Sequence, residues 1–155
     1  MSNALSRLPT RILLGLSGFR RAMTLGVRAA AFDADGRVLL VKHSYAPGWY
    51  LPGGGVEPGE TFEIAAAREL MEEGGIALGA PPQLFGLYLN RTISLRDHVA
   101  LFVCSVWTQE KPPNVPNMEI VDIGFFAPDR LPEGATDATR RRLAEIAGGE
   151  RSAYW

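Results

Sequence analysis

The chain has 155 residues, of which 46% are hydrophobic and 21% are charged, and its formal net charge is −1. This length and composition fit one globular domain that is large enough to bury a core. The near-zero charge argues against a protein that coats duplex nucleic acid, because such domains are strongly basic. No run is long and apolar enough to predict a transmembrane segment. The single cysteine, Cys104, cannot form an internal disulfide, so we expect a cytoplasmic protein.

The segment 1–24 predicts an amphipathic helix that extends the domain at its N-terminus. Its apolar residues lie three or four positions apart and form one stripe: Leu8, Ile12, Leu16, Phe19 and Met23. We expect this helix to pack on the domain or on a second subunit in a homodimer. Two alternatives stay open, a helix bound to a membrane surface and a partly disordered arm. The apolar run ILLGLSG is short and has no cleavage site close behind it, which argues against an export signal.

Strand patterns begin at Leu25. Two apolar runs, 25–32 and 37–45, flank the sequence Asp33-Ala34-Asp35-Gly36, and Asp-Gly between apolar runs predicts a β-hairpin. A short run at 48–51 leads into a glycine-rich loop.

Three further strands are predicted at 82–90, 98–108 and 120–128, and a last helix at about 136–147. Between them, the proline-rich segment 111–117 predicts a loop that could act as a lid over a binding site.

Together these elements predict one domain at 25–148, in which a mixed β-sheet lies between α-helices, an α/β or α+β fold. Residues 149–155 are expected to form a C-terminal tail.

A helix rich in glutamate is predicted at 62–73. Thr61 is a good N-cap, and Gly74-Gly75 supplies a C-terminal stop. At 100° per residue, one face carries the carboxylates of Glu69, Glu72 and Glu73. The opposite face carries Ile64, Ala67 and Met71, with Leu70 at its margin, and we expect it to pack on the sheet.

The carboxylate face has two interpretations. Clustered carboxylates are the ligands that Mg²⁺ and Mn²⁺ prefer, yet an acidic helix face is more often solvated surface. The preceding loop favours a metal site, because the three glycines of Gly53-Gly54-Gly55 let a ligand approach the backbone closely. Glu57 and Glu60 add two more carboxylates at the start of the helix.

The segment 54–76 resembles the signature of the Nudix hydrolases, G-x5-E-x7-R-E-U-x-E-E-x-G-U, where U is a bulky aliphatic residue. Every position of the signature is filled: Gly54, Glu60, Arg68, Glu69, Leu70, Glu72, Glu73, Gly75 and Ile76. A chance match in a chain of this length is on the order of one in 10⁷. The resemblance implies the Nudix fold, with the signature as a loop, a helix and a second loop.

The resemblance also implies a reaction, the hydrolysis of a phosphoanhydride bond in a nucleoside diphosphate linked to another group, with Mg²⁺ or Mn²⁺ as cofactor. The implied metal ligands are Glu69, Glu72, Glu73 and the backbone carbonyl of Gly54 or of a neighbouring glycine. The implied supporting pair, which fixes the ligands in place, is Glu60 and Arg68. Glu69 is the first candidate for the base that takes the proton of the attacking water, and Glu119 is the second.

The signature does not define the substrate. Candidate phosphate contacts are Arg28, Lys42, Arg91 and Arg96, candidate stacking residues are Tyr50, Phe85 and Tyr88, and His43 and His98 are candidates for either contact. Nucleotide sugars, dinucleoside polyphosphates, nucleoside triphosphates and ADP-ribose all stay open. The alternative function is a catalytically silent Nudix module that binds a nucleotide without cleaving it.

Overall fold

The computed structural model describes residues 22–155, so residues 1–21 of the predicted N-terminal helix lie outside the described residues, and its last residue, Thr24, instead begins a strand. Its elements in chain order are β1 (Thr24–Ala31), β2 (Val38–His43), β3 (Trp49–Tyr50), α2 (Phe62–Gly74), β4 (Ile76–Leu78), β5 (Gln83–Leu89), β6 (Asp97–Cys104), β7 (Trp107–Gln109), β8 (Ile120–Phe126) and α3 (Asp137–Ile146). Within this range, no helix has both the length and the apolar character needed to cross a bilayer.

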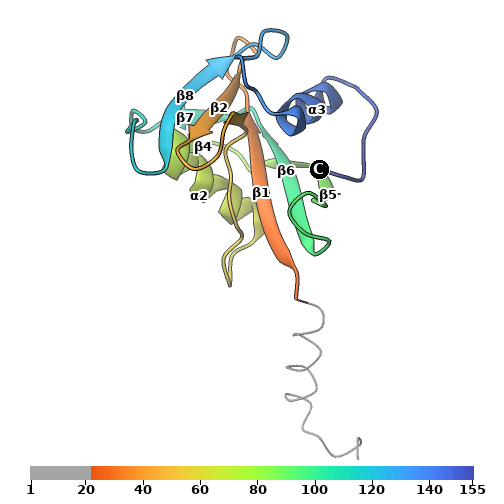
Figure 1. Cartoon of the computed structure of the whole chain (residues 1–155). Coiled ribbons are helices and arrows are strands. Elements are labelled where there is room, and N and C mark those ends of the chain that lie inside the picture. The colour runs from red at the N-terminus through yellow and green to blue at the C-terminus, as the bar shows by residue number, and fades with distance from the viewer. Residues whose placement is uncertain (1–21) are drawn as a thin grey trace, which may run out of the picture.

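The strands form three small sheets (Figure 1). One sheet has the order β1-β6-β5, with β1 parallel and β5 antiparallel to β6. A second sheet has the order β3-β2-β8 and is antiparallel throughout, and β4 pairs with β7. This mixture of parallel and antiparallel pairs agrees with the predicted mixed sheet.

The two helices cover opposite faces of these strands. Along β1, Val27, Ala29 and Ala31 join the core cluster that contains Leu70 of α2. The alternate residue Ala30 joins a second cluster, which contains Leu143 of α3. Because successive strand residues point to opposite faces, β1 is buried between two helical layers. The predicted fold class, a mixed sheet between helices, is confirmed.

The predicted hairpin at Asp33–Gly36 is wrong in its pairing. The turn itself forms, since the Gly36 N–H donates to the Asp33 carbonyl at 3.0 Å. The flanking strands then separate into different sheets and share only the bridge between Phe32 and Val38. The Asp-Gly signal predicts only the local turn. The pairing of β1 depends on burial of both its faces, and its parallel partner is the apolar strand β6.

The predicted strand at 98–108 is in fact two strands, because the chain leaves the first sheet at Ser105 and Val106. The part after the break, β7, pairs with β4, a three-residue strand that the sequence analysis does not predict. The Trp107 indole N–H donates to the Phe32 carbonyl at 2.8 Å and fixes this change of direction.

Helix α2 has the predicted caps but a different buried face. The Thr61 hydroxyl accepts from the Ile64 N–H, and Gly75 takes the left-handed conformation at φ 65°. The predicted packing face is wrong, because Ile64 is 55% exposed, whereas Leu70 is fully buried. Ala65 and Ala66, also fully buried, let the helix approach the sheet closely. The helix is thus rotated about its axis relative to the prediction, and Glu73 lies on its buried side.

The last residues of the chain, 153–155, hydrogen-bond to the end of β5. The Leu89 N–H donates to the Ala153 carbonyl at 3.0 Å, and the Trp155 N–H donates to the Leu89 carbonyl at 3.1 Å. The Trp155 ring lies edge-on to Tyr88, 5.6 Å between centroids. The segment predicted as a tail therefore contributes a side chain to the second core cluster.

The revised face of α2 predicts unequal costs for two truncations in one helix. We expect Leu70→Ala to lower the free energy of unfolding by about 2–5 kcal/mol, because it opens a cavity in the core. The control Ile64→Ala should cost less than about 1 kcal/mol, since that side chain is mostly exposed. Urea denaturation measures both values, and a larger cost for Ile64→Ala would contradict this packing.

Candidate active site

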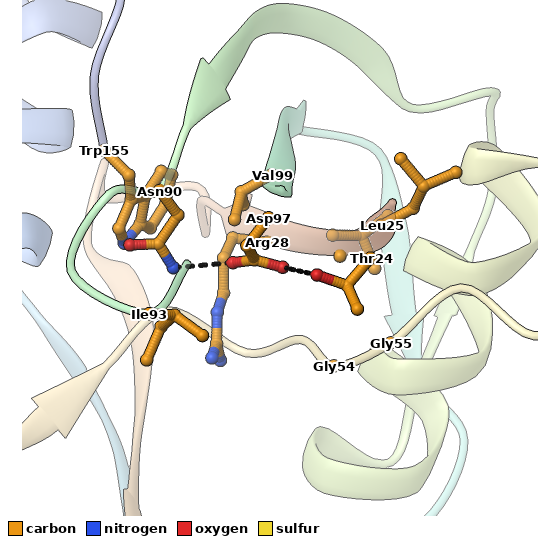
Figure 2. A pocket seen from close by; sticks show the side chains of 12 residues that line it. Thr24, Leu25, Arg28, Gly54, Gly55, Asn90, Ile93, Asp97, Val99 and Trp155 are labelled. Atoms are coloured by element: carbon orange, nitrogen blue, oxygen red, sulfur yellow. Dashed lines mark hydrogen bonds between the residues drawn. The ribbon is translucent and has the colours of Figure 1, made fainter. Parts of the chain in front are cut away.

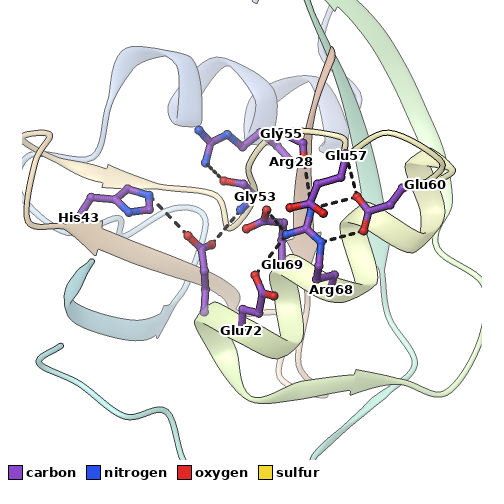
Figure 3. A network of polar contacts seen from close by, with 10 residues as sticks. Arg28, His43, Gly53, Gly55, Glu57, Glu60, Arg68, Glu69 and Glu72 are labelled. Carbon is purple, nitrogen blue, oxygen red and sulfur yellow. Dashed lines mark hydrogen bonds and ion pairs between the residues drawn. The ribbon is translucent and has the colours of Figure 1, made fainter. Parts of the chain in front are cut away.

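The glycine-rich turn lies directly against the acidic face of α2 (Figure 3). The backbone N–H of Gly53 donates to Oε2 of Glu73 at 2.9 Å. A Cβ at position 54 would lie 2.4 Å from Oε1 of Glu69, so only glycine allows that carboxylate to sit there without a shift. The turn and the helix thus place two glutamates under one stretch of backbone.

Arg68 connects the carboxylates to one another and to the turn. Its Nε and Nη2 donate to the two oxygens of Glu60 at 2.8 and 3.0 Å. Its Nη1 donates to Glu69 at 2.7 Å and to Glu72 at 3.2 Å, and Nη2 also donates to the Gly55 carbonyl at 2.9 Å. These hydrogen bonds hold the pKa of Glu60 down at about 2, so this partner of Arg68 stays ionised.

Burial raises the pKa of the inner glutamates. The Glu73 side chain is only 6% exposed. Its burial raises the pKa to about 8, with further increases from the charges of Glu69 and Glu119, and only partial relief from the Gly53 N–H and Arg28. Burial also raises the pKa of Glu69, and the hydrogen bond from Arg68 offsets part of that rise. Glu72, at 59% exposed, faces solvent at the margin of the cluster.

The carbonyl groups of the turn have partners. Gly53 accepts from Nη1 of Arg28 at 2.8 Å, Gly54 accepts from the N–H of Val27 at 2.9 Å, and Gly55 accepts from Arg68. The carbonyl predicted as a metal ligand, that of Gly54, is thus bonded to β1. What Gly54 provides beside α2 is space for Glu69.

His43, the last residue of β2, and Glu119, just before β8, lie next to the acidic cluster. Nε2 of His43 lies 3.8 Å from Oε1 of Glu73, and one ligand atom from each of His43, Glu73 and Glu119 lies within 4.8 Å of the others. Burial, and next the charge of Arg28, lowers the pKa of His43, so the imidazole is neutral near pH 7. The sequence predicted His43 only as a candidate substrate contact, and the signal for this position was a histidine at the end of the apolar strand β2.

A pocket of about 320 Å³ adjoins the glycine turn (Figure 2). Gly54, Gly55, Arg28 and Asn90 contribute to its lining. On its polar wall, Asp97 accepts hydrogen bonds from Asn90 at 2.8 Å and from the Thr24 hydroxyl.

A second pocket, of about 280 Å³, shares four residues with the first: Arg28, Asn90, Ile93 and Trp155. Of the predicted substrate residues, Arg28 lines both pockets and Tyr50 lines the second. Lys42 and Arg91 line neither, since Lys42 is exposed on β2 and Arg91 lies over the Tyr154 ring at 3.5 Å. Asn90 and Trp155 were not predicted, because nothing in the sequence indicates that their segments meet.

The charged signature residues Glu60, Arg68, Glu69 and Glu72 form one hydrogen-bonded network at the glycine turn. The NUDIX domain family matches residues 23–146 of the chain. The chain belongs to the Nudix hydrolase family. It is similar to a MutT-like protein of Streptomyces ambofaciens, with 32% identity over 130 residues that cover 81% of this chain and 78% of the relative.

Two solved structures resemble this Nudix hydrolase. A MutT NUDIX hydrolase from Burkholderia pseudomallei has a TM-score of 0.67 and 32% identity, covering 79% of this chain and 97% of its own. An ADP-ribose pyrophosphatase from Streptococcus suis has a TM-score of 0.62 and 26% identity, covering 83% of this chain and 94% of its own. The family relationship makes this chain an enzyme of the hydrolase class.

The donor set of this Nudix hydrolase fits a divalent cation. The buried carboxylate of Glu73 and the partly buried carboxylate of Glu69 have raised pKa values, because nearby positive charge does not fully compensate their desolvation. A bound cation would favour their ionised forms, and carboxylate oxygens are the ligands that hard cations select. Glu72 adds an exposed carboxylate at the open side of the same cluster.

Proposed function

We propose that this enzyme uses Mg²⁺ or Mn²⁺ to hydrolyse a phosphoanhydride bond in a nucleoside diphosphate derivative. The observation that carries the proposal is the placement of the buried Glu73 and the partly buried Glu69 beside the glycine turn, where a cation would favour their ionised forms. In this proposal Glu69, Glu72 and Glu73 hold the cation, together with a backbone carbonyl of the turn. Gly54 remains the predicted carbonyl, and Gly53, next to it, is the alternative.

The chain's own residues prepare the site for this chemistry. A bound divalent cation would neutralise phosphate charge and lower the pKa of a water molecule. Arg68 holds Glu69 and Glu72 by hydrogen bonds, and Glu60 holds Arg68 through a bidentate pair. This arrangement limits the rotation of both ligands before the substrate arrives, which reduces the ordering that the reaction requires.

We assign the proton-accepting role first to Glu69. Its pKa is raised by burial, and a base works best when its pKa approaches the working pH. Glu119 is the second candidate, because it approaches the cluster from the segment before β8.

The two pockets are the proposed substrate site. Arg28 is fixed at their shared edge by donating from Nη1 to the carbonyls of Leu51 and Gly53, and a guanidinium is well suited to phosphate. Tyr50 and Trp155 offer aromatic faces to a base or ribose. The related ADP-ribose pyrophosphatase supports a nucleoside diphosphate linked to another group as substrate class.

The proposed domain spans residues 25–148, and the family match at 23–146 supports that boundary. The silent-module alternative is disfavoured, because a site that only binds a nucleotide has no need for an intact set of carboxylates with the Arg68 network around it.

The activity is tested with a panel of nucleotide sugars, dinucleoside polyphosphates, nucleoside triphosphates and ADP-ribose, with products separated by liquid chromatography. We expect hydrolysis of at least one compound with Mg²⁺ or Mn²⁺, and none after chelation by EDTA.

Glu72→Gln should lower kcat/KM by at least about tenfold, because it removes a charged ligand. The control Glu63→Gln, an exposed change in the same helix, should leave the rate within about twofold.

Full activity in EDTA, or equal rates for Glu72→Gln and Glu63→Gln, would remove the metal proposal. Tight binding of a panel compound with no turnover in any metal would instead support the silent module.

The role of Gly54 gives a second prediction. Gly54→Ala should displace the Glu69 carboxylate, and because a 1 Å displacement can cost about 100-fold in rate, we expect a loss of about 10–100-fold. The melting temperature should change little, since a flexible side chain can turn aside. Gly55→Ala is the matched control, because its Cβ would meet no atom within 4 Å. Equal activity of the two variants would show that Glu69 needs no such space.

A further inference from the structure

We propose that His43, Glu73 and Glu119 form a mixed nitrogen and oxygen site for a divalent transition-metal cation, of which Mn²⁺ and Co²⁺ are the probes. The inference rests on the proposed function, since it shares Glu73 with the carboxylate cluster. It goes further by adding a histidine from β2 as a ligand and by giving the site a preference among metals.

The spacing of the three groups suits one cation. A metal about 2.1 Å from each ligand atom separates neighbouring ligands by roughly 3.0 Å and opposite ligands by roughly 4.2 Å. Nε2 of His43 and Oε1 of Glu73 are 3.8 Å apart, and all three groups offer an atom within 4.8 Å of the others. Small side-chain rotations therefore bring these atoms to coordination distance.

The imidazole of His43 is buried without a hydrogen bond. The residue is 5% exposed, and among residues 22–155 neither Nδ1 nor Nε2 has a hydrogen-bond partner. Buried polar atoms are nearly always satisfied, so such a pair requires an explanation. Figure 3 shows the ring pointing from β2 toward the acidic cluster, with Nε2 nearest to Glu73. A cation between them would give the Nε2 lone pair its partner.

Aromatic packing holds the ring in this direction. Tyr45 stacks on it with centroids 4.9 Å apart and planes inclined by 27°, and Tyr50 contacts it at 5.5 Å. The Tyr50 hydroxyl donates to the Pro47 carbonyl at 2.8 Å, which restrains that side chain in turn. Aromatic packing therefore orients the ring before any cation binds.

The two carboxylates have complementary roles in this site. Oε2 of Glu73 accepts from the Gly53 N–H, so Oε1 is the oxygen directed at His43. Glu119 is exposed, and its backbone carbonyl accepts from the Ser44 N–H at 2.8 Å, which keeps it next to the end of β2. Its side chain can close over the cation from the solvent side.

A nitrogen ligand changes the metal preference. Mg²⁺ is held by oxygen ligands and retains several waters, whereas imidazole binds the later divalent metals more strongly. The site should therefore bind Mn²⁺ and Co²⁺ more tightly than Mg²⁺. The carboxylates of Glu69 and Glu72 bind all three metals.

Mn²⁺ electron spin echo spectroscopy tests the nitrogen ligand directly. The chain has two histidines, so His98→Gln leaves His43 as the only imidazole. We expect ¹⁴N modulation from bound Mn²⁺ in the parent and in His98→Gln, and its loss in His43→Gln. The dissociation constant for Mn²⁺, from the free-ion signal, should rise at least about tenfold in His43→Gln, with less than about a threefold change for competing Mg²⁺.

A second measurement needs no substitution. Parent protein labelled with ¹⁵N at histidine alone should replace the ¹⁴N lines with ¹⁵N lines, even if His43→Gln folds poorly.

Two outcomes separate the proposals. Tight Mn²⁺ binding with no histidine modulation would overturn the His43 site and leave the carboxylate cluster intact. No Mn²⁺ binding at any concentration up to millimolar would overturn both.

Discussion

The hydrogen bond from the Gly53 N–H to the buried Glu73 carboxylate sets the distance between the glycine turn and α2. Because the turn lies this close, Glu69 fits only against a glycine at position 54. The arrangement places two carboxylates in a region of low solvent access, where their charge is costly and their pKa values rise. A bound divalent cation would offset the desolvation cost of the ionised carboxylates. In our account, this attraction for a cation is what makes the cluster a catalytic centre.

The rest of the domain supports this contact. Ala65 and Ala66 bring α2 against the sheet, and Leu70 anchors it in the core. Arg68 then spans the helix, the turn and Glu60, so two of the proposed ligands, Glu69 and Glu72, are held by hydrogen bonds from one guanidinium. The adjoining pockets share Arg28 with the turn, which places a cation for phosphate next to the carboxylates. The proposed substrate pockets and the proposed metal ligands therefore lie along one edge of the glycine turn (Figures 2 and 3).

Local signals predicted the local features of this molecule well. Thr61 and Gly75 delimited α2, and the spacing of the glutamates identified the cluster. Tertiary packing determined the features that local sequence patterns did not predict. The apolar Ile64 suggested the wrong buried face, because small alanines pack closer to the sheet than a branched side chain would. Contacts between distant segments could not be predicted from local patterns either. The separation of the two strands around Asp33–Gly36, the approach of His43 to Glu73 and the position of Trp155 are seen only in the folded structure.

The central claim is that the carboxylates of Glu69, Glu72 and Glu73 capture a divalent cation. Crystals soaked in millimolar Mn²⁺ and examined by anomalous scattering at the manganese edge test it most directly. The account predicts an anomalous peak within coordination distance of Glu69, Glu72 and Glu73, beside the Gly53-Gly54 turn. An anomalous map without a peak there, or a structure in which these three side chains point away from the turn, would contradict it.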